Sequence, residues 1–167
     1  QRIRLSTEVS SGSNTWIIKV QSGNLLHEAA LFVLANEITN NQDLELLYTD
    51  NDHVDVNGKF FDPYMKPDWN PDLLSGINYF SELTVIKNRL WKEFFSESKD
   101  SHEIVKNITR SLSVDQIKHV PHVLGSILVQ DNDSHLNPTT TKIKYPLPQP
   151  APLVSILIPT KNKGKML

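Results

Sequence analysis

The chain has 167 residues, which suits one domain with a core and is too short for two full domains. Its 19 acidic and 17 basic residues give a formal charge of -2 without a basic cluster, which argues against nucleic acid as a partner. No apolar run approaches the roughly 20 residues of a membrane-spanning helix. Cysteine is absent, so disulfides and thiolate chemistry are excluded. The sequence opens at Gln1 without a signal-peptide pattern, so we expect a cytoplasmic piece of a longer polypeptide.

The first predicted elements are a strand, a helix and a strand. Residues 15–20, TWIIKV, form an apolar and β-branched run typical of a buried strand. Residues 25–39 place apolar side chains at helical spacing, which predicts an amphipathic helix ending near Asn40 and Asn41. Residues 44–50, LELLYTD, predict a second strand. This order predicts a βαβ unit with parallel strands.

The middle of the chain predicts a hairpin followed by shorter elements. Apolar and polar residues alternate around Asn57-Gly58, a pair that favours a tight hairpin turn. Asn70 is the expected N-cap of a helix with Pro71 at its first position. The later elements are then a strand over residues 81–87, helices over 88–95 and 101–112, and a strand from residue 116 that ends at Pro121.

The composition changes after residue 130. Residues 131–152 are polar and then proline-rich, which predicts an extended linker between domains. Residues 153–158, LVSILI, are apolar on both faces, as in the middle strand of a parallel sheet. We expect this strand to pair with a sheet, either in its own chain or in a neighbouring copy by strand exchange.

Residues 46–79, LLYTDNDHVDVNGKFFDPYMKPDWNPDLLSGINY, resemble family 2 glycosyltransferases of bacterial surface-polysaccharide pathways. The most specific part of the match is the run from Lys66 to Trp69. Residues 153–167 are similar to the first strand and loop of the same kind of domain. The resemblance implies an α/β fold of GT-A type, the nucleotide-diphospho-sugar transferase fold, with a mixed sheet and flanking helices. Residues 1–130 would form its acceptor-side half, and residues 153–167 would begin a second domain.

The resemblance also implies site residues. It places the catalytic base at Asp100, which would accept a proton from the acceptor hydroxyl. The substrate-binding residues implied for the nucleotide-sugar and the glycan acceptor are Asp50, Asp52, Lys66, Asp68, Trp69 and Asn78. Trp69 would offer a flat apolar face to a sugar ring.

The family usually carries an Asp-x-Asp motif whose carboxylates hold a divalent cation against the donor pyrophosphate. Here Gln21, Ser22 and Gly23 occupy those positions, with Asn24 where a further Asp is common. Neutral side chains are weak ligands, so we expect this segment to bind neither metal nor other cofactor. The resemblance still implies Mn²⁺ or Mg²⁺ in the parent enzyme.

Two functions stay open at this point. In the first, the chain is part of a glycosyltransferase that moves a sugar from a nucleotide-sugar to a cell-surface glycan, at the inner face of the membrane. Alternatively, it is a non-catalytic glycosyltransferase-like module that packs against an active neighbour. Ordinary explanations also exist for single residues: Asp50, Asp52 and Asp55 suit turn chemistry, and the pair His119 and His122 suits satisfied or exposed histidines rather than zinc.

Overall fold

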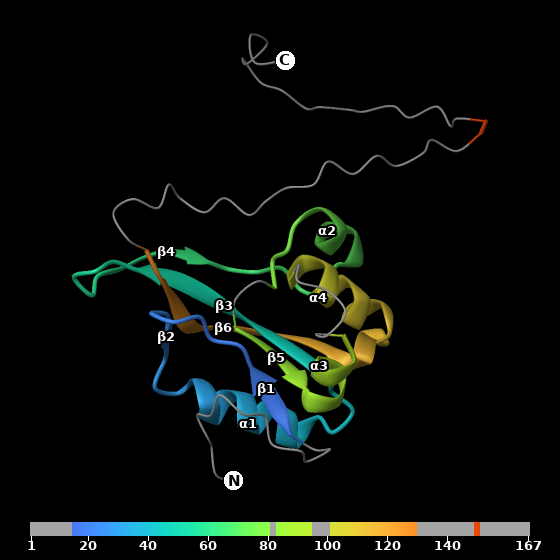
Figure 1. Cartoon of the computed structure of the whole chain (residues 1–167), viewed down its shortest axis with the longest axis horizontal. Helices are drawn as coiled ribbons and strands as arrows, with labels where there is room; N and C mark the ends of the chain where they lie inside the picture. The colour runs from blue at the N-terminus through green and yellow to red at the C-terminus, as the bar shows by residue number, and fades with distance from the viewer. Residues whose placement is uncertain (1–14, 81–82, 95–100, 130–148, 151–167) are drawn as a thin grey trace, which may run out of the picture.

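The structure is a computed structural model that describes residues 15–80, 83–94, 101–129 and 149–150. It is a mixed α/β fold whose helices flank one sheet (Figure 1). In chain order the elements are β1 (Trp16–Ile18), β2 (Leu25–Leu26), α1 (Ala30–Asn40), β3 (Leu46–Val54), β4 (Phe60–Tyr64), α2 (Pro71–Gly76), β5 (Thr84–Lys87), α3 (Asn88–Phe94), α4 (Ser101–Arg110), a 3-10 turn (Val114–Gln116) and β6 (Ile117–Leu128). Within the described residues, no helix has the length and apolar character needed to cross a bilayer.

The sheet has the strand order β1-β5-β3-β6-β2, and β4 pairs with the far half of β3. Among the strands that the structure describes, β3 and β6 are the one parallel pair, and the other pairs are antiparallel. Because β1 and β3 are both antiparallel to β5, they point the same way, as the βαβ prediction required. They are not neighbours, however, since β5 lies between them, as in a split βαβ unit.

Two cores lie on opposite faces of the sheet, which follows from the alternation of side chains along each strand. Leu46 and Tyr48 of β3 face the core that α2, α3 and α4 cover, whereas Leu47 faces the core beneath α1. The helix predicted within residues 25–39 buries an apolar face against the sheet, because Ala30 and Leu34 of α1 are in the core. Figure 1 shows α1 on one side of the sheet and α2 and α4 on the other.

The predicted start of the first helix is wrong. Residues 25 and 26 form β2, which pairs antiparallel with Ser126 and Gly125 of β6. The helix itself begins at Ala30. Helical spacing includes Leu26 in the apolar face, but its partner strand lies about a hundred residues later, where local periodicity carries no information.

The predicted end of the last strand is also wrong. β6 continues through Pro121 to Leu128. The pairing with β3 jumps from Thr49 opposite Val120 to Asp50 opposite Val123, so Pro121 lies in an irregularity of the ladder. A bulge tolerates proline because the missing N–H is not required there.

The hairpin is confirmed, with one difference in its turn. β3 runs without a break from the predicted second strand into the hairpin, and β4 returns antiparallel to it. Gly58 has a positive φ of 80°, whereas Asn57 does not, because the loop is held by the Asp55 side chain. The Asp55 carboxylate accepts the backbone N–H groups of Asn57 and Lys59, which is the turn chemistry expected for this residue.

The predicted helix at residue 70 is confirmed, because the Asn70 side chain accepts the backbone N–H of Leu73 at 2.9 Å and Pro71 opens α2. The strand β5 and the helices α3 and α4 match their predictions in position. The predicted linker over residues 131–152, apart from residues 149–150, and the predicted strand and loop over 153–167 lie outside the described residues, as does Asp100.

Candidate functional site

The candidate site lies where β3 and β6 run side by side. Tyr48 of β3 is opposite His119 of β6 in the parallel register, and Asp50 follows Tyr48 on the same face of its strand. The rings of Tyr48 and His119 stack, with centroids 4.9 Å apart and planes 12° from parallel. The chain segment that carries the family resemblance then packs over this part of the sheet.

His119 lies between two carboxylates. Its Nε2 is 2.8 Å from Oδ1 of Asp50, and its Nδ1 is 3.0 Å from Oδ1 of Asp68. The side chains of His119 and Asp50 are 7% and 3% exposed, whereas that of Asp68 is 97% exposed. The three residues therefore form a chain of contacts that leads from the sheet interior to solvent.

The two contacts of the imidazole differ in what each protonation form of the ring allows. A carboxylate only accepts hydrogen bonds, so each ring nitrogen that contacts one must donate. An imidazole that donates from both nitrogens is the imidazolium form, which makes both contacts charge-assisted. A neutral ring has only one N–H, so it can donate to only one of the two carboxylates. The other contact is then lost, unless that carboxyl group is protonated and donates to the ring nitrogen.

The same buried carboxylate fixes the start of the Lys66–Trp69 run. Asp50 Oδ1 also accepts the backbone N–H of Lys66 at 2.8 Å, and the Tyr48 hydroxyl donates to the carbonyl of Pro67 at 2.8 Å. Lys66 is buried as a residue, at 4% exposure. The prolines hold this segment extended while two side chains of β3 anchor its backbone, which places Asp68 above His119.

A second set of contacts holds the next turn of chain. The Tyr79 hydroxyl accepts the backbone N–H of Asn70 at 3.0 Å and donates to its carbonyl at 3.1 Å. The Trp69 indole is half-buried and lies 5.7 Å from the Phe80 ring. Trp69 is therefore at least in part a packing residue of the core under α2.

Burial sets the chemistry of the two phenols in this region. Loss of solvent raises the pKa of Tyr48 far above its ordinary value of 10.0, and the charges of Tyr79 and Asp68 raise it further. Burial likewise raises the pKa of Tyr79, although its hydrogen bond with Asn70 opposes the shift. Both hydroxyls therefore stay protonated, so each donates a hydrogen bond and neither serves as a base that takes up a proton.

The structure brings Asp50, Lys66 and Asp68 together and leaves other predicted residues apart. Asp52, further along β3, lines a separate groove beside β2 and β4. Asn78 follows α2, and its Oδ1 is buried without a hydrogen-bond donor among the described residues. The position predicted for the catalytic base, Asp100, lies outside the described residues.

His119 is the residue that the sequence did not reveal as part of the site. The sequence favours a satisfied or exposed histidine, and His119 is satisfied, but by two of the predicted substrate-binding residues. Its partners Asp50 and Asp68 are 69 and 51 positions away, so no local motif marks them as a group. The one available signal was that residues 44–50 and the residues from 116 are both predicted as strands, and strands far apart in sequence can be neighbours in a sheet.

The residues at the expected metal position do not fit a hard cation. The Asn24 side-chain oxygen accepts the backbone N–H of Leu128 at 3.0 Å, and Gly23 turns the chain with a φ of 92°. Gln21 contributes its carbonyl to the Asn24 backbone N–H at 3.1 Å. Across the described ranges, no three His, Asp or Glu side chains are grouped as metal ligands. The side chain of this turn that could offer an oxygen, Asn24, instead binds the backbone of β6, and the turn carries no carboxylate.

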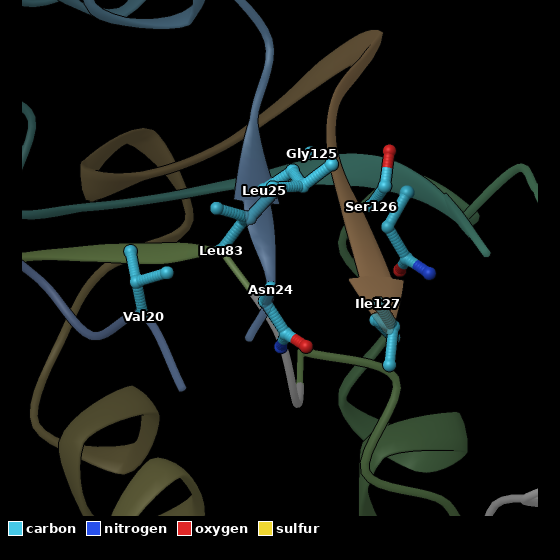
Figure 2. A pocket seen from close by; sticks show the side chains of 8 residues that line it. Val20, Asn24, Leu25, Leu83, Gly125, Ser126 and Ile127 are labelled. Atoms are coloured by element: carbon cyan, nitrogen blue, oxygen red, sulfur yellow. The ribbon is translucent and has the colours of Figure 1, made fainter. Parts of the chain in front are cut away.

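A small crevice lies beside this turn, between β2 and β6. Its volume is about 10 Å³, and it is lined in part by Asn24, Leu25, Leu83 and Gly125 (Figure 2). The contacts here are very close, since a Cβ on Gly125 would be 2.2 Å from Leu83 Cδ1 and 2.9 Å from the backbone oxygen of Leu25. The crevice is therefore a product of tight packing and not a ligand site.

Comparison with known proteins gives two relatives that cover most of this chain. The uncharacterized protein y4gI of Sinorhizobium fredii is 30% identical over 199 aligned positions, which include 96% of this chain and 22% of that protein. The O-antigen biosynthesis protein RfbC of Myxococcus xanthus is 26% identical over 184 positions, which include 87% of this chain and 14% of that protein. No family model matches the chain. The chain thus spans less than a quarter of the length of either relative.

Proposed function

We propose that this chain is part of a GT-A glycosyltransferase of family 2 that transfers a sugar from a nucleotide-sugar to a cell-surface glycan, at the cytoplasmic side of the membrane. The observation that carries the proposal is the contact of His119 with both Asp50 and Asp68, together with the hydrogen bond from the Lys66 backbone N–H to Asp50. Asp50, Lys66 and Asp68 all belong to the segment that resembles this family. The similarity to an O-antigen biosynthesis protein supports a role in polysaccharide synthesis.

In this proposal the exposed carboxylate of Asp68 binds hydroxyl groups of the acceptor glycan. Hydroxyls donate to carboxylates, and a charged acceptor makes the stronger bonds. His119 holds Asp68 in place from below, and Asp50 in turn holds His119. Asp100 would act as the base that takes the proton from the reacting hydroxyl. Asp68 is thus a binding residue, while Asp50 and His119 are positioning residues.

The test compares Asp68→Ala with Asp43→Ala in the protein as the cell makes it. Asp43 is an exposed residue, so its change should move the free energy of unfolding by no more than about 0.5 kcal/mol. Asp68→Ala also removes a partner of the buried His119 ring, so it should cost about 1 kcal/mol, and both variants are assayed under conditions in which they are folded. The assay follows release of nucleoside diphosphate from UDP-, GDP- and dTDP-sugars, with lipid-linked glycan as acceptor. We expect Asp68→Ala to lower kcat/KM for the acceptor about tenfold or more, as for loss of a charged hydrogen bond. Equal activity of the two variants would show that Asp68 does not bind the acceptor.

A second function is favoured by one specific observation. Asn24 and Gly23 are used in a turn that joins β6, where the family carries metal-binding carboxylates. This supports the alternative that the chain is a non-catalytic module, which packs against an active neighbouring domain. In that case Asp68→Ala and Asp100→Asn would both leave sugar transfer unchanged, whereas deletion of residues 15–129 would abolish it.

A further inference from the structure

The two carboxylates that contact His119 lie in very different surroundings. The side chains of Asp50 and His119 are 3% and 7% exposed, whereas that of Asp68 is 97% exposed. The distances are nevertheless similar, 2.8 Å from Nε2 to Asp50 and 3.0 Å from Nδ1 to Asp68. The two contacts therefore have much the same geometry but differ in what it costs to break them.

The contact with Asp50 is the more costly one to break. A buried carboxylate that loses a donor regains little from solvent, so most of its desolvation remains uncompensated. The Asp50 oxygen is also fixed in place by the Lys66 backbone N–H, which it accepts at 2.8 Å. The exposed carboxylate of Asp68, in contrast, can replace a lost donor with water. When only one of the two hydrogen bonds can be kept, we expect the bond to Asp50 to be kept.

Loss of one proton from the ring forces this choice. The single N–H of a neutral His119 then lies on Nε2, where it faces Asp50, and Nδ1 becomes an acceptor. A bare ring nitrogen and a carboxylate have no hydrogen to share, so the Asp68 side chain turns to solvent. Histidine ordinarily changes charge between about pH 5 and 8, so the gain or loss of this proton falls in the range in which proteins work.

Other titratable residues lie on the elements packed against the ring. Besides the two carboxylates they are Tyr48, Asp52, Lys66, Tyr79, Lys118 and His122. Burial raises the pKa of both phenols, so they remain neutral. Lys118 binds Glu37 of α1 at 2.6 Å, on the opposite face of the sheet, and His122 is exposed. Among the described residues, the charges that directly contact the ring nitrogens are those of the two carboxylates.

From these contacts we propose that His119 is a proton-dependent switch for the Asp68 side chain. The imidazolium holds this side chain against the sheet, and the neutral ring releases it. The backbone of the segment stays in place in both states, because two side chains of β3 hold it at Lys66 and Pro67. The consequence for activity rests on the proposed function: acceptor affinity falls as the ring loses its proton, because a released side chain must be ordered again on binding.

The test is a pH titration of the ¹⁵N- and ¹³C-labelled 167-residue chain, followed by NMR of the His119 ring nitrogens and the Asp68 carboxyl carbon. We expect both ring nitrogens to carry hydrogen at the acidic end. As the pH rises, Nδ1 should lose its hydrogen while Nε2 keeps it, and the Asp68 signal should change over the same interval. The backbone amide of Lys66 should remain protected from hydrogen exchange throughout, since its acceptor on Asp50 is unchanged.

Two variants with matched controls test which ring carries the response. In His119→Gln the Asp68 signal should no longer change over this interval, whereas in His122→Gln, a change at an exposed residue, it should. Because His119 is buried, Asp68→Asn tests the same contact from the exposed side. A neutral amide stabilises a cation less than a carboxylate does, so the His119 ring should titrate at lower pH in Asp68→Asn than in the control Asp43→Asn.

The effect on activity is measured in the protein as the cell makes it. The KM for the acceptor glycan should rise about threefold as the ring loses its proton, which corresponds to the ordering of one side chain. In His119→Gln the KM should not change over this interval, whereas in His122→Gln it should change as in the unaltered protein.

The switch is overturned if the neutral His119 ring keeps its hydrogen on Nδ1, if the Asp68 signal does not follow the ring, or if Asp68→Asn titrates as Asp43→Asn does. Such a failure is distinct from failure of the proposed function. If Asp68→Ala loses sugar transfer although the ring and Asp68 titrate independently, only the switch is wrong. If the two titrate together but the acceptor KM does not follow, the role proposed for Asp68 in acceptor binding is wrong.

Discussion

Asp50 is a buried carboxylate on the central strand, and one of its oxygens accepts hydrogen bonds from two distant parts of the chain. One donor is the backbone N–H of Lys66, and the other is the ring of His119. Removing this oxygen takes the acceptor from the Lys66 backbone N–H and from Nε2 of His119, while Nδ1 of the ring keeps its contact with Asp68. Such losses are larger than the net value of the bonds themselves, because the remaining groups stay desolvated.

We predict that Asp50→Ala lowers the free energy of unfolding by about 3 kcal/mol, the upper range for a charged hydrogen-bond partner. Asp50→Asn should lose less, because its side chain keeps an acceptor oxygen. Urea denaturation measures both, with exposed Asp43→Ala as the control. A loss in Asp50→Ala no greater than that in the control would show that the two contacts contribute no stability.

Asp55 provides a prediction for acidic pH. Hydrogen bonds to its carboxylate from the backbone N–H of Lys59, and then of Asn57, hold its pKa below the ordinary value of 3.8. Because the folded chain has the lower pKa, the stabilisation of the turn is complete above about pH 3.8 and is lost as the pH falls through the folded value. Carboxyl ¹³C NMR should give a midpoint below 3.8 in the folded chain but not in urea. A folded midpoint at or above 3.8 would contradict the turn geometry.

At the scale of elements, β2 and β6 approach closely at Gly125. A methyl group on this residue would meet both the Leu83 side chain and the Leu25 backbone, and backbone cannot move aside cheaply. Leu83 is itself constrained, with a φ of 53°. The short strand β2 therefore depends on glycine at this position of its partner.

We predict that Gly125→Ala lowers the free energy of unfolding by about 1–3 kcal/mol, as other overpacked sites do. Gly58→Ala is the comparison, since its Cβ would meet nothing within 4 Å and only its φ of 80° is unfavourable. That backbone strain costs about 1 kcal/mol. Thermal or urea denaturation ranks the two variants, and a smaller loss in Gly125→Ala would show that β2 moves away freely.

The sequence predicted those elements whose signals are local. The cap at Asn70 and the turn at Gly58 are set by neighbouring residues, and both are confirmed. The errors at residues 25–26 and at Pro121 share a different cause, because both depend on a strand far away in the chain. The role of His119 was missed for the same reason, although its partners Asp50 and Asp68 had been named individually from the family resemblance.

At the scale of the whole molecule, the described part of the sheet has three strands that pair on one side only, namely β1, β2 and β4. β4 is a poor partner for a further strand, because Pro63 lacks an N–H and the ladder is irregular between Asn51 and His53. A strand formed by residues 153–158 would therefore find its better partners at β1 or β2.

We predict that the backbone amides of residues 153–158 are protected from hydrogen exchange, because an apolar strand left unpaired in water is unfavourable. Protection that does not depend on protein concentration would mean pairing within one chain. Protection that grows with concentration, together with dimers in sedimentation, would mean exchange between copies. Amides that exchange at the rate of an unfolded peptide at every concentration would show that this prediction is wrong.

The pairing of β3 with β6 has a consequence for how the domain folds. β6 lies between β3 and β2, yet its contact with Asp50 spans 69 positions of sequence. Contacts of such long separation close slowly, because the entropy of the intervening loop is lost first. A nascent chain that has emerged only as far as α4 can pair β3 with β4 and β5, but it lacks β6, which is the partner of β2 and the parallel partner of β3. It also lacks His119 under the Asp68 segment. This domain should therefore complete its sheet only after β6 has left the ribosome, in one late and cooperative step.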